Sequence, residues 1–505
     1  MSDRTQHPSS GGARSRAGGS GRQAVVDIGS NSIRLVIYDG PARAPAPICN
    51  EKALCGLGRD MGADGRLNPA AVDYALATLA RFRRLIEAHG EPPTTTFATA
   101  AVREAADGPD FVGRVRALGF DVRVIDGGEE ASLAALGVVS YEPGATGIVG
   151  DMGGGSLELI AVANGFVEDN VSLSIGPLRL MQQAGGKIAD ADPIVARALE
   201  GVGWAAPGRF ETLYAVGGAW RAIARIHMRL KSYPLSVLHH YELTKEEAIE
   251  VCDLLVKQSR RSLEEIPGIP RRRIDTLPYA ALVMRAVLLK TKVKRIFVSA
   301  GGVREGVLFN NLGAEERLED PLFAGARFFA DRLAPEPRVG DAVAGLTETL
   351  FADETPEQKR LRIATCILSD IGAFFHPDLR AAQAFDTALR APFYGVTHNE
   401  RIAIALSLYC RHDGRKPALP DEQALALLSA EEQQRAIQLG LALRFAGALA
   451  PKAPDAIAGC GLTKADGKIV FRAPEAVREL MGELPRKRLE SLAIAFEAAP
   501  AEEYY

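Results

Sequence analysis

Short apolar runs, most of them ending at a glycine, alternate with longer stretches of helical periodicity between residues 23 and 312. The short runs predict strands, and apolar positions spaced three and four apart predict helices. The predicted strands are 24–28, 33–38, 95–99, 121–125, 146–151, 157–163, 213–216 and 294–299. The predicted helices are 70–88, 109–118, 130–140, 219–230, 245–258 and 277–290. This alternation is typical of an α/β fold.

Beyond about residue 313 the pattern becomes helical, over 321–332, 341–351, 358–374, 400–410 and 422–448. The last stretch, 461–505, regains a short strand at 468–472 and a closing helix. We therefore expect five segments along the chain. They are a tail at 1–22, two α/β domains at 23–134 and 135–312, a helical domain at 313–450, and a small α+β domain at 451–505.

Composition limits the class of protein. With 47% hydrophobic residues among 505, the chain can bury sizeable cores. The net charge of -3 argues against a general nucleic-acid coat protein, which needs clustered Lys and Arg. The six cysteines form no CxxC pair, and no apolar run suits a membrane span or a signal peptide. We expect a cytoplasmic protein with no membrane partner, and a disordered tail rich in Gly, Ser and Arg.

One pattern occurs twice. Val-Val-Asp-Ile-Gly-Ser-Asn-Ser at 25–32 returns as Val-Gly-Asp-Met-Gly-Gly-Gly-Ser at 149–156. The duplication predicts two similar half-domains that face each other across a cleft. Backbone N–H groups of such turns can converge on phosphate oxygens, although a single turn of this kind is more often a plain hairpin. The candidate phosphate-binding residues are Gly29, Ser30, Asn31, Ser32, Gly153, Gly154, Gly155 and Ser156.

Three carboxylates lie in or at the ends of apolar strands: Asp27, Asp151 and Glu158. An unpaired charge buried there would be costly, so each needs a partner. Oxygen ligands beside phosphate suit Mg²⁺, which takes one or two carboxylates together with water and substrate oxygens. A salt bridge or a backbone hydrogen bond at the strand end is the alternative.

Two further residues have a functional and an ordinary interpretation. Glu129 and Glu130 open a predicted helix, where acidic residues usually favour the helix dipole. Arg103 follows a strand, and it is either a surface arginine or a clamp on a transferring phosphoryl group. Two more strand–glycine–helix junctions, at 215–218 and 299–306, complete the set of loops found around the cleft of actin-like ATPases and sugar kinases.

These segments, in order, resemble the exopolyphosphatase/guanosine pentaphosphate phosphatase family over about residues 24–310. The motifs are Asp27–Ser32, Ala100–Arg103, Gly128–Ala131, Asp151–Glu158, Ser174–Gly176 and Gly302–Gly306. The resemblance implies two actin-like (ribonuclease H-like) half-domains followed by a mostly helical HD-like region, as in the longer exopolyphosphatases. It implies Mg²⁺ or another divalent cation as cofactor, and a homodimer.

The resemblance also implies roles for individual residues. Glu130 becomes the general base that activates water, and Arg103 holds the terminal phosphate. Asp151 and Glu158 become metal ligands, with Asp27 as a further contributor. Phosphoryl transfer depends mainly on positioning and on charge neutralisation, which these residue types supply. At a helix N-terminus Glu130 is expected to be ionised at neutral pH.

Two departures from the family pattern limit what carries over. Tyr279 stands where family members commonly have glycine, in Pro278-Tyr279-Ala280. In the helical region Ser369-Asp370 replaces the metal-binding His-Asp pair of HD domains. We therefore expect His376, His398 and His412 to be core or surface histidines, and the region to be structural.

The sequence therefore predicts an exopolyphosphatase that removes terminal phosphate from inorganic polyphosphate. Hydrolysis of guanosine pentaphosphate to the tetraphosphate is the nearest alternative, because it would use the same site. An actin-like kinase and a non-catalytic sensor of guanosine phosphates or polyphosphate are more distant ones.

Overall fold

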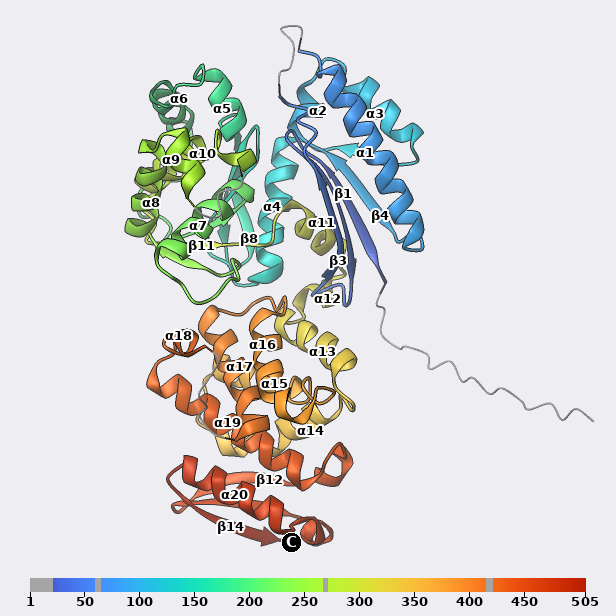
Figure 1. Ribbon diagram of the computed structural model, residues 1–505, viewed down its shortest axis with the longest axis vertical. Helices are drawn as coiled ribbons and strands as arrows, with labels where there is room; N and C mark the ends of the chain where they lie inside the picture. Colours follow the sequence, from blue (N-terminus) through green and yellow to red (C-terminus); the bar gives the residue numbers. More distant parts are fainter. Residues whose placement is uncertain (1–20, 60–64, 267–270, 415–420) are drawn as a thin grey trace, which may run out of the picture.

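The computed structural model describes residues 21–59, 65–266, 271–414 and 421–505. Two α/β lobes lie side by side, and a helical region with a small terminal sheet extends away from them (Figure 1). The predicted tail at 1–22 falls outside the described residues except for Gly21 and Arg22. The predicted alternation of strands and helices is confirmed in both lobes.

The first lobe contains a five-stranded sheet in the order β3-β2-β1-β4-β5. Its strands are β1 (Gln23–Ile28), β2 (Ile33–Asp39), β3 (Ala46–Ala53), β4 (Thr94–Ala98) and β5 (Val122–Val124). β1 pairs antiparallel with β2 and parallel with β4. The helices are α1 (Pro69–Ala88), α2 (Ala100–Glu104) and α3 (Gly108–Ala117). α1 begins where the Asn68 side chain accepts a hydrogen bond from the Ala70 N–H at 3.0 Å, a typical N-cap.

The second lobe contains a six-stranded sheet in the order β10-β11-β9-β6-β7-β8. Its strands are β6 (Gly147–Met152), β7 (Leu157–Ala163), β8 (Phe166–Leu173), β9 (Thr212–Val216), β10 (Glu242–Thr244) and β11 (Arg295–Val298). Its helical elements are α5 (Pro177–Gln183), α6 (Ile188–Glu200), α7 (Gly218–Leu230), α8 (Lys245–Lys257), α9 (Arg260–Glu265), η1 (Arg271–Arg273) and α10 (Leu277–Thr291). β6, β9 and β11 run parallel, so their carboxyl ends meet at one edge of the sheet.

Two helices, α4 (Gly127–Tyr141) and α11 (Val303–Asn310), lie between the sheets of the two lobes (Figure 1). Glycines permit their close contact. A Cβ atom added to Gly306 would lie 1.8 Å from the Leu133 carbonyl oxygen, and one added to Gly137 would lie 2.1 Å from the Gly302 carbonyl oxygen. The middle of α4 and the start of α11 therefore pack backbone against backbone.

The C-terminal region is mainly helical. Its elements are α12 (Ala314–Leu318), α13 (Pro321–Leu333), α14 (Val339–Leu346), η2 (Thr349–Phe351), α15 (Pro356–Ile367), η3 (Pro377–Leu379), α16 (Arg380–Arg390), α17 (His398–Asp413), α18 (Glu422–Leu425), α19 (Ala430–Leu449), η4 (Pro454–Ile457), η5 (Glu475–Leu480) and α20 (Glu483–Ala495). A three-stranded sheet, β12-β13-β14, closes it with β12 (Gly461–Ala465), β13 (Lys468–Ala473) and β14 (Ala499–Tyr504).

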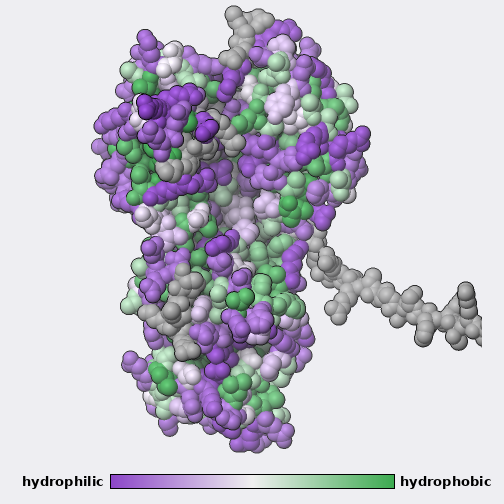
Figure 2. Space-filling view, in the orientation of Figure 1, coloured by the Kyte–Doolittle hydropathy of each residue, from purple (hydrophilic) through white to green (hydrophobic). Residues whose placement is uncertain are grey.

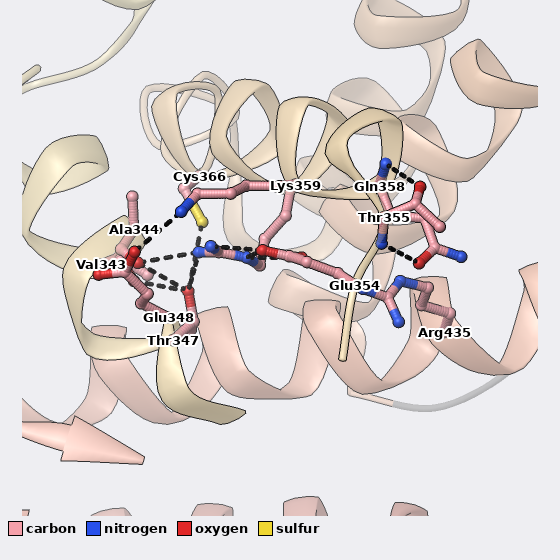
Figure 3. Close-up of polar contacts among 11 residues, drawn as sticks. Val343, Ala344, Thr347, Glu348, Glu354, Thr355, Gln358, Lys359, Cys366 and Arg435 are labelled. Carbon is pink, nitrogen blue, oxygen red and sulfur yellow. Dashed lines mark hydrogen bonds and ion pairs between the residues drawn. The ribbon is translucent and has the colours of Figure 1, made fainter. Parts of the chain in front are cut away.

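A buried ion pair ties the helical region together. The Arg362 guanidinium donates to Glu354 at 2.8 Å, and the two side chains are only 3% and 6% exposed. Arg435 of α19 approaches the same carboxylate from the other side at 3.2 Å (Figure 3). Arg362 also donates to the Ala344 carbonyl, so its remaining N–H groups find acceptors. Because every charge here is paired, the network links α15 to α19 through Glu354.

The sequence missed five strands: β3, β8, β10, β12 and β14. β3 and β8 are edge strands whose residues are largely exposed, so neither has the continuous apolar run that marks a buried strand. The prediction that the chain closes with a helix is wrong, because β14 follows α20 and pairs with β13.

Hydrophilic residues predominate on the face drawn in Figure 2, with hydrophobic residues between them in small groups. Among the described residues, no helix combines the length and the apolar character that a bilayer crossing requires.

Candidate active site

The two copies of the repeated pattern form the same turn. The Gly29 N–H donates to the Ser32 carbonyl at 3.1 Å, and the Gly153 N–H donates to the Ser156 carbonyl at 3.1 Å. Each turn joins two antiparallel strands, β1 to β2 and β6 to β7. The equivalence expected from the sequence is therefore real at the level of backbone hydrogen bonds.

The two turns lie against each other. A Cβ atom added to Gly154 would be 3.2 Å from the Asn31 Cβ, and one added to Gly155 would be 3.4 Å from the Ser30 Oγ. Larger side chains at Gly154 and Gly155 would push the turns apart, so glycine at these positions allows the turns to lie close together. The structure thus brings all eight candidate phosphate-binding residues into one place.

Asp27, near the end of β1, is neutralised by Arg304. The Arg304 guanidinium donates to it at 2.9 Å, and both side chains are largely buried. On β2 the residue in register with Asp27 is Arg34. Burial lowers the pKa of Arg34 to about 10, helped by the positive charges of Arg304 and Arg221. Asp27 therefore sits in a positively charged environment.

The corresponding aspartate of the second lobe faces a carboxylate where Asp27 faces an arginine. Asp151 on β6 is in register with Glu158 on β7, so the two carboxylates share one face of the sheet. Within the described residues, no basic side chain comes within ion-pair distance of either one. Burial raises the pKa of Asp151 to about 6, although Arg221 and Arg304 oppose the shift.

Glu158 is only 2% exposed. Burial raises its pKa, and the charge of Asp151 raises it further. The Ser172 hydroxyl of β8 donates to it at 2.8 Å, which favours the ionised form. A divalent cation bound between Asp151 and Glu158 would offset the charge of both carboxylates, and carboxylate oxygens are ligands that such a cation accepts. No ready-made group of three or more His, Cys, Asp or Glu ligands occurs in the described part of the chain, so the protein alone offers no full cage.

Glu130 lies in the first turn of α4, where the Asp126 side chain caps the helix by accepting from the Glu129 N–H at 2.8 Å. α4 packs on β8 near Ser172, since a Cβ atom added to Gly127 would lie 2.9 Å from the Ser172 Cβ. Ser172 in turn bonds Glu158, so this packing places Glu130 on the side of the sheet that carries Glu158.

The environment of Glu130 corrects one expectation. Burial raises its pKa well above the usual range for glutamate, and the charge of Glu158 raises it further, while Arg103 opposes the shift. Position at a helix N-terminus therefore does not by itself keep this carboxylate ionised. Its neighbour Glu129 points elsewhere and pairs with the exposed Arg123 at 2.7 Å.

Arg103 is held in place by two acceptors. Its Nη1 donates to the Ile125 carbonyl at 2.8 Å and to Glu130 at 3.3 Å. Its side chain is 24% exposed, so it is not the surface arginine of the alternative interpretation. Across the two lobes Arg179 of α5 pairs with Glu104, the residue next to Arg103. Part of the guanidinium remains able to contact an incoming anion.

Several charged residues of the site had no role in the predictions from sequence: Arg34, Arg179, Arg221, Arg304 and Glu305. The sequence did contain a signal for Arg34. This residue stands in the first copy of the repeated pattern where Glu158 stands in the second. Glu305 caps α11 by accepting from the Gly302 N–H at 3.0 Å, and it also accepts from the Tyr38 hydroxyl at 2.8 Å. Both bonds fix the segment that presents Arg304 to Asp27.

In the helical region, the aspartate of Ser369-Asp370, which replaces the His-Asp pair of HD domains, forms ion pairs. Asp370 is 2% exposed and pairs with Arg411 at 3.0 Å and with Lys452. Burial acts to raise the pKa of Asp370, but Arg411 and Lys452 outweigh it and hold that pKa below its usual value. His376 is exposed, while burial beside Arg411 lowers the pKa of His412 to about 3.

Comparison with known proteins identifies two matched regions. Residues 36–315 match the Ppx/GppA phosphatase family, and residues 342–497 match the family described as "Exopolyphosphatase, C-terminal". The first match contains every candidate site residue from Arg103 onward. The second covers most of the helical region and two strands of its small sheet, β12 and β13.

Three similar proteins agree with these matches. Retrograde regulation protein 2 of Saccharomyces cerevisiae is 27% identical over 78% of this chain and 73% of its own length. Exopolyphosphatase 1 of Mycobacterium leprae is 25% identical over 58% of this chain and 90% of its own length. The crystal structure of an exopolyphosphatase from Cytophaga hutchinsonii is 26% identical, with a TM-score of 0.53, over 57% of this chain and 97% of that one. The predicted fold class, two actin-like half-domains before a helical region, is confirmed by this similarity.

Proposed function

Because the chain belongs to the Ppx/GppA phosphatase family, we propose that it is an exopolyphosphatase that removes terminal phosphate from inorganic polyphosphate by attack of water. The observation that carries the proposal is the buried Glu130 beside the facing pair Asp151 and Glu158, next to two adjoining phosphate-type turns. The names of similar proteins supply the substrate.

The turns and the arginines bind the substrate in this proposal. Backbone N–H groups and the hydroxyls of Ser30 and Ser156 receive phosphate oxygens at the point where the two turns meet. Arg103 approaches the terminal phosphoryl group and offsets charge that develops in the transition state. Its fixed position, on the Ile125 carbonyl, means that little ordering is needed when the substrate arrives.

Asp151 and Glu158 would hold a divalent cation, and their donor set fits one. Two carboxylate groups, Glu158 buried and Asp151 half-buried, face each other and form no ion pair with a basic residue among the described residues. Asp27 contributes from the other turn, although its bond to Arg304 makes it the weaker ligand. A bound Mg²⁺ would neutralise charge on the substrate and, by offsetting the two carboxylates, bring the pKa of Glu130 down toward neutrality.

Glu130 then acts as the general base that accepts a proton from the attacking water. A buried carboxylate of raised pKa is a stronger base than an exposed one, provided that it is ionised when the substrate is bound. Arg103 holds the carboxylate through Oε2 and leaves the other oxygen free to accept the proton.

The experiment compares phosphate release from long-chain polyphosphate, guanosine pentaphosphate and ATP, each with Mg²⁺ and with excess chelator. The proposal predicts release from polyphosphate that requires Mg²⁺ and exceeds release from the other two. Faster release from guanosine pentaphosphate would assign the alternative activity to the same site. Transfer of phosphate from ATP to an acceptor would indicate a kinase, and binding without release would indicate a sensor.

The predicted homodimer and cytoplasmic location remain predictions. Light scattering on the purified full-length chain tests the first, and fractionation of the source cell tests the second.

A further inference from the structure

A cluster of aromatic and histidine rings joins the helical region to the second lobe. It consists of Tyr141, Tyr233, His239, Tyr394 and His398, and is called the junction cluster below. The rings of Tyr141 and Tyr394 stack at 3.6 Å with an interplanar angle of 3°. Tyr141 is the last residue of α4, the helix whose first turn carries Glu130. The helical region therefore touches the far end of a helix that builds the candidate site.

His398, the first residue of α17, is 5% exposed and makes two hydrogen bonds to the second lobe. Its Nε2 lies 2.9 Å from the His239 carbonyl oxygen, which can only accept, so Nε2 carries the proton. Its Nδ1 lies 2.8 Å from the Tyr233 hydroxyl and therefore accepts. The His239 carbonyl requires this tautomer of neutral His398, and the Tyr233 hydroxyl fits it by donating.

His239 continues the connection to the site. Its Nδ1 accepts from the Ala300 N–H at 3.3 Å. Ala300 begins the Ala300–Gly302 segment, which runs directly into α11. At the other end of that short segment the Gly302 N–H is held by Glu305, and Arg304 binds Asp27. Three residues thus separate the contact with His239 from the arginine that neutralises Asp27.

We propose that His398 is a positioning residue for the active site. By holding the His239 backbone it fixes the Ala300–Gly302 segment, and with it the placement of Arg304 against Asp27. The expected effect of His398 on turnover rests on the proposed function. Its expected effect on the Ala300–Gly302 segment does not depend on that function. The helical region then has a role beyond stability, because it determines the geometry of the site in the two lobes.

The test uses three variants of the full-length chain. His398→Phe keeps the ring volume and removes both hydrogen bonds. His398→Gln keeps a side-chain N–H for the His239 carbonyl. Leu439→Ala, in the core of α19, destabilises the helical region without touching the junction cluster, and is the matched control. Tyr233→Phe serves as a second probe if His398→Phe does not fold, since it removes the hydroxyl that holds the His398 ring at Nδ1.

The first measurement is amide hydrogen exchange without substrate. For His398→Phe we expect exchange in residues 299–305 to rise about tenfold, with α15 unchanged, because only the local contact is lost. Leu439→Ala should raise exchange in α19 and leave 299–305 as in the parent. The second measurement is phosphate release, where His398→Phe should lower kcat about tenfold with little change in KM, and His398→Gln should recover most of it.

Unchanged exchange at 299–305 in folded His398→Phe, or in Tyr233→Phe if that probe is needed, would overturn the inference. So would an equal response to Leu439→Ala, which would show that general destabilisation is enough. A parent protein that releases no phosphate would contradict the proposed function alone, and the exchange measurement would still decide the role of His398.

Discussion

Asp151 of β6 lies directly opposite Glu158 of β7, so a half-buried and a buried carboxylate share one face of the sheet. The same register in the first lobe places Arg34 opposite Asp27. The two copies of the repeated pattern therefore share a backbone and differ in charge. Asp27 forms an ion pair with Arg304, whereas Asp151 and Glu158 form none among the described residues. This asymmetry supports the proposal that a divalent cation would bind at the second copy.

The first prediction is that two aspartate substitutions change the stability of the protein in opposite directions when a chelator removes divalent cations. Asp151→Asn should raise the free energy of unfolding by about 1 kcal/mol, because it removes a charge that burial disfavours and that lies opposite the Glu158 carboxylate. Asp27→Asn should lower that free energy by about 1–3 kcal/mol, because it leaves the buried Arg304 without its partner. Urea denaturation of both variants measures the difference.

Adding Mg²⁺ should stabilise the parent and have little effect on Asp151→Asn, since ligand binding to the folded state alone raises stability. Equal stabilisation of the two proteins would contradict the assignment of Asp151 as a ligand.

The second prediction concerns acid. Burial, with Arg401 and His240 nearby, lowers the pKa of His398 to about 4, below the usual 6.5. The unfolded chain therefore takes up a proton at His398 before the folded chain does, and stability falls as pH drops from about 6.5 to 4. Between pH 7 and pH 5 this site should cost about 1–2 kcal/mol.

His398→Gln lacks the titrating group, so the gap in melting temperature between parent and variant should narrow as pH falls from 7 to 5. Thermal denaturation of the two proteins at several pH values measures it. A gap that stays constant with pH would show that His398 is not held neutral in the folded protein.

The third prediction tests the close packing of α4 on α11. Gly306→Ala should destabilise the protein by about 1–3 kcal/mol, because the new methyl group has no room beside the Leu133 carbonyl. Gly113→Ala is the matched control in α3, where nothing lies within 4 Å of the added Cβ. The control should be neutral or stabilise by up to about 1 kcal/mol. Equal effects of the two substitutions on the melting temperature would argue against a tight contact.

The sequence predicted the parts of the site that depend on local pattern. The repeated strand–turn–strand unit placed Asp27 and Asp151 at equivalent positions because strand ends and glycine turns are visible in a single stretch of chain. The consequences of burial were not visible. Glu130 was expected to be ionised from its place in a helix, whereas its pKa depends on Glu158, which is distant in sequence.

Contacts between distant segments were equally out of reach. Nothing in the sequence around His398 indicates that it meets the His239 carbonyl, since the two residues come together only when α17 docks on the second lobe. The edge strands β3 and β8 were missed for a related reason. Their pairing with β2 and β7 comes from backbone hydrogen bonds, not from an apolar pattern of their own.

The most direct test of the account compares Glu130→Gln with Glu129→Gln in phosphate release from long-chain polyphosphate with Mg²⁺. Glu129 is the matched control, since it lies on the same helical turn and pairs with Arg123 outside the site. The account predicts that Glu130→Gln folds normally, binds polyphosphate, and loses about a hundredfold to ten-thousandfold in turnover, while Glu129→Gln keeps near-normal turnover. Near-normal turnover of Glu130→Gln would contradict it.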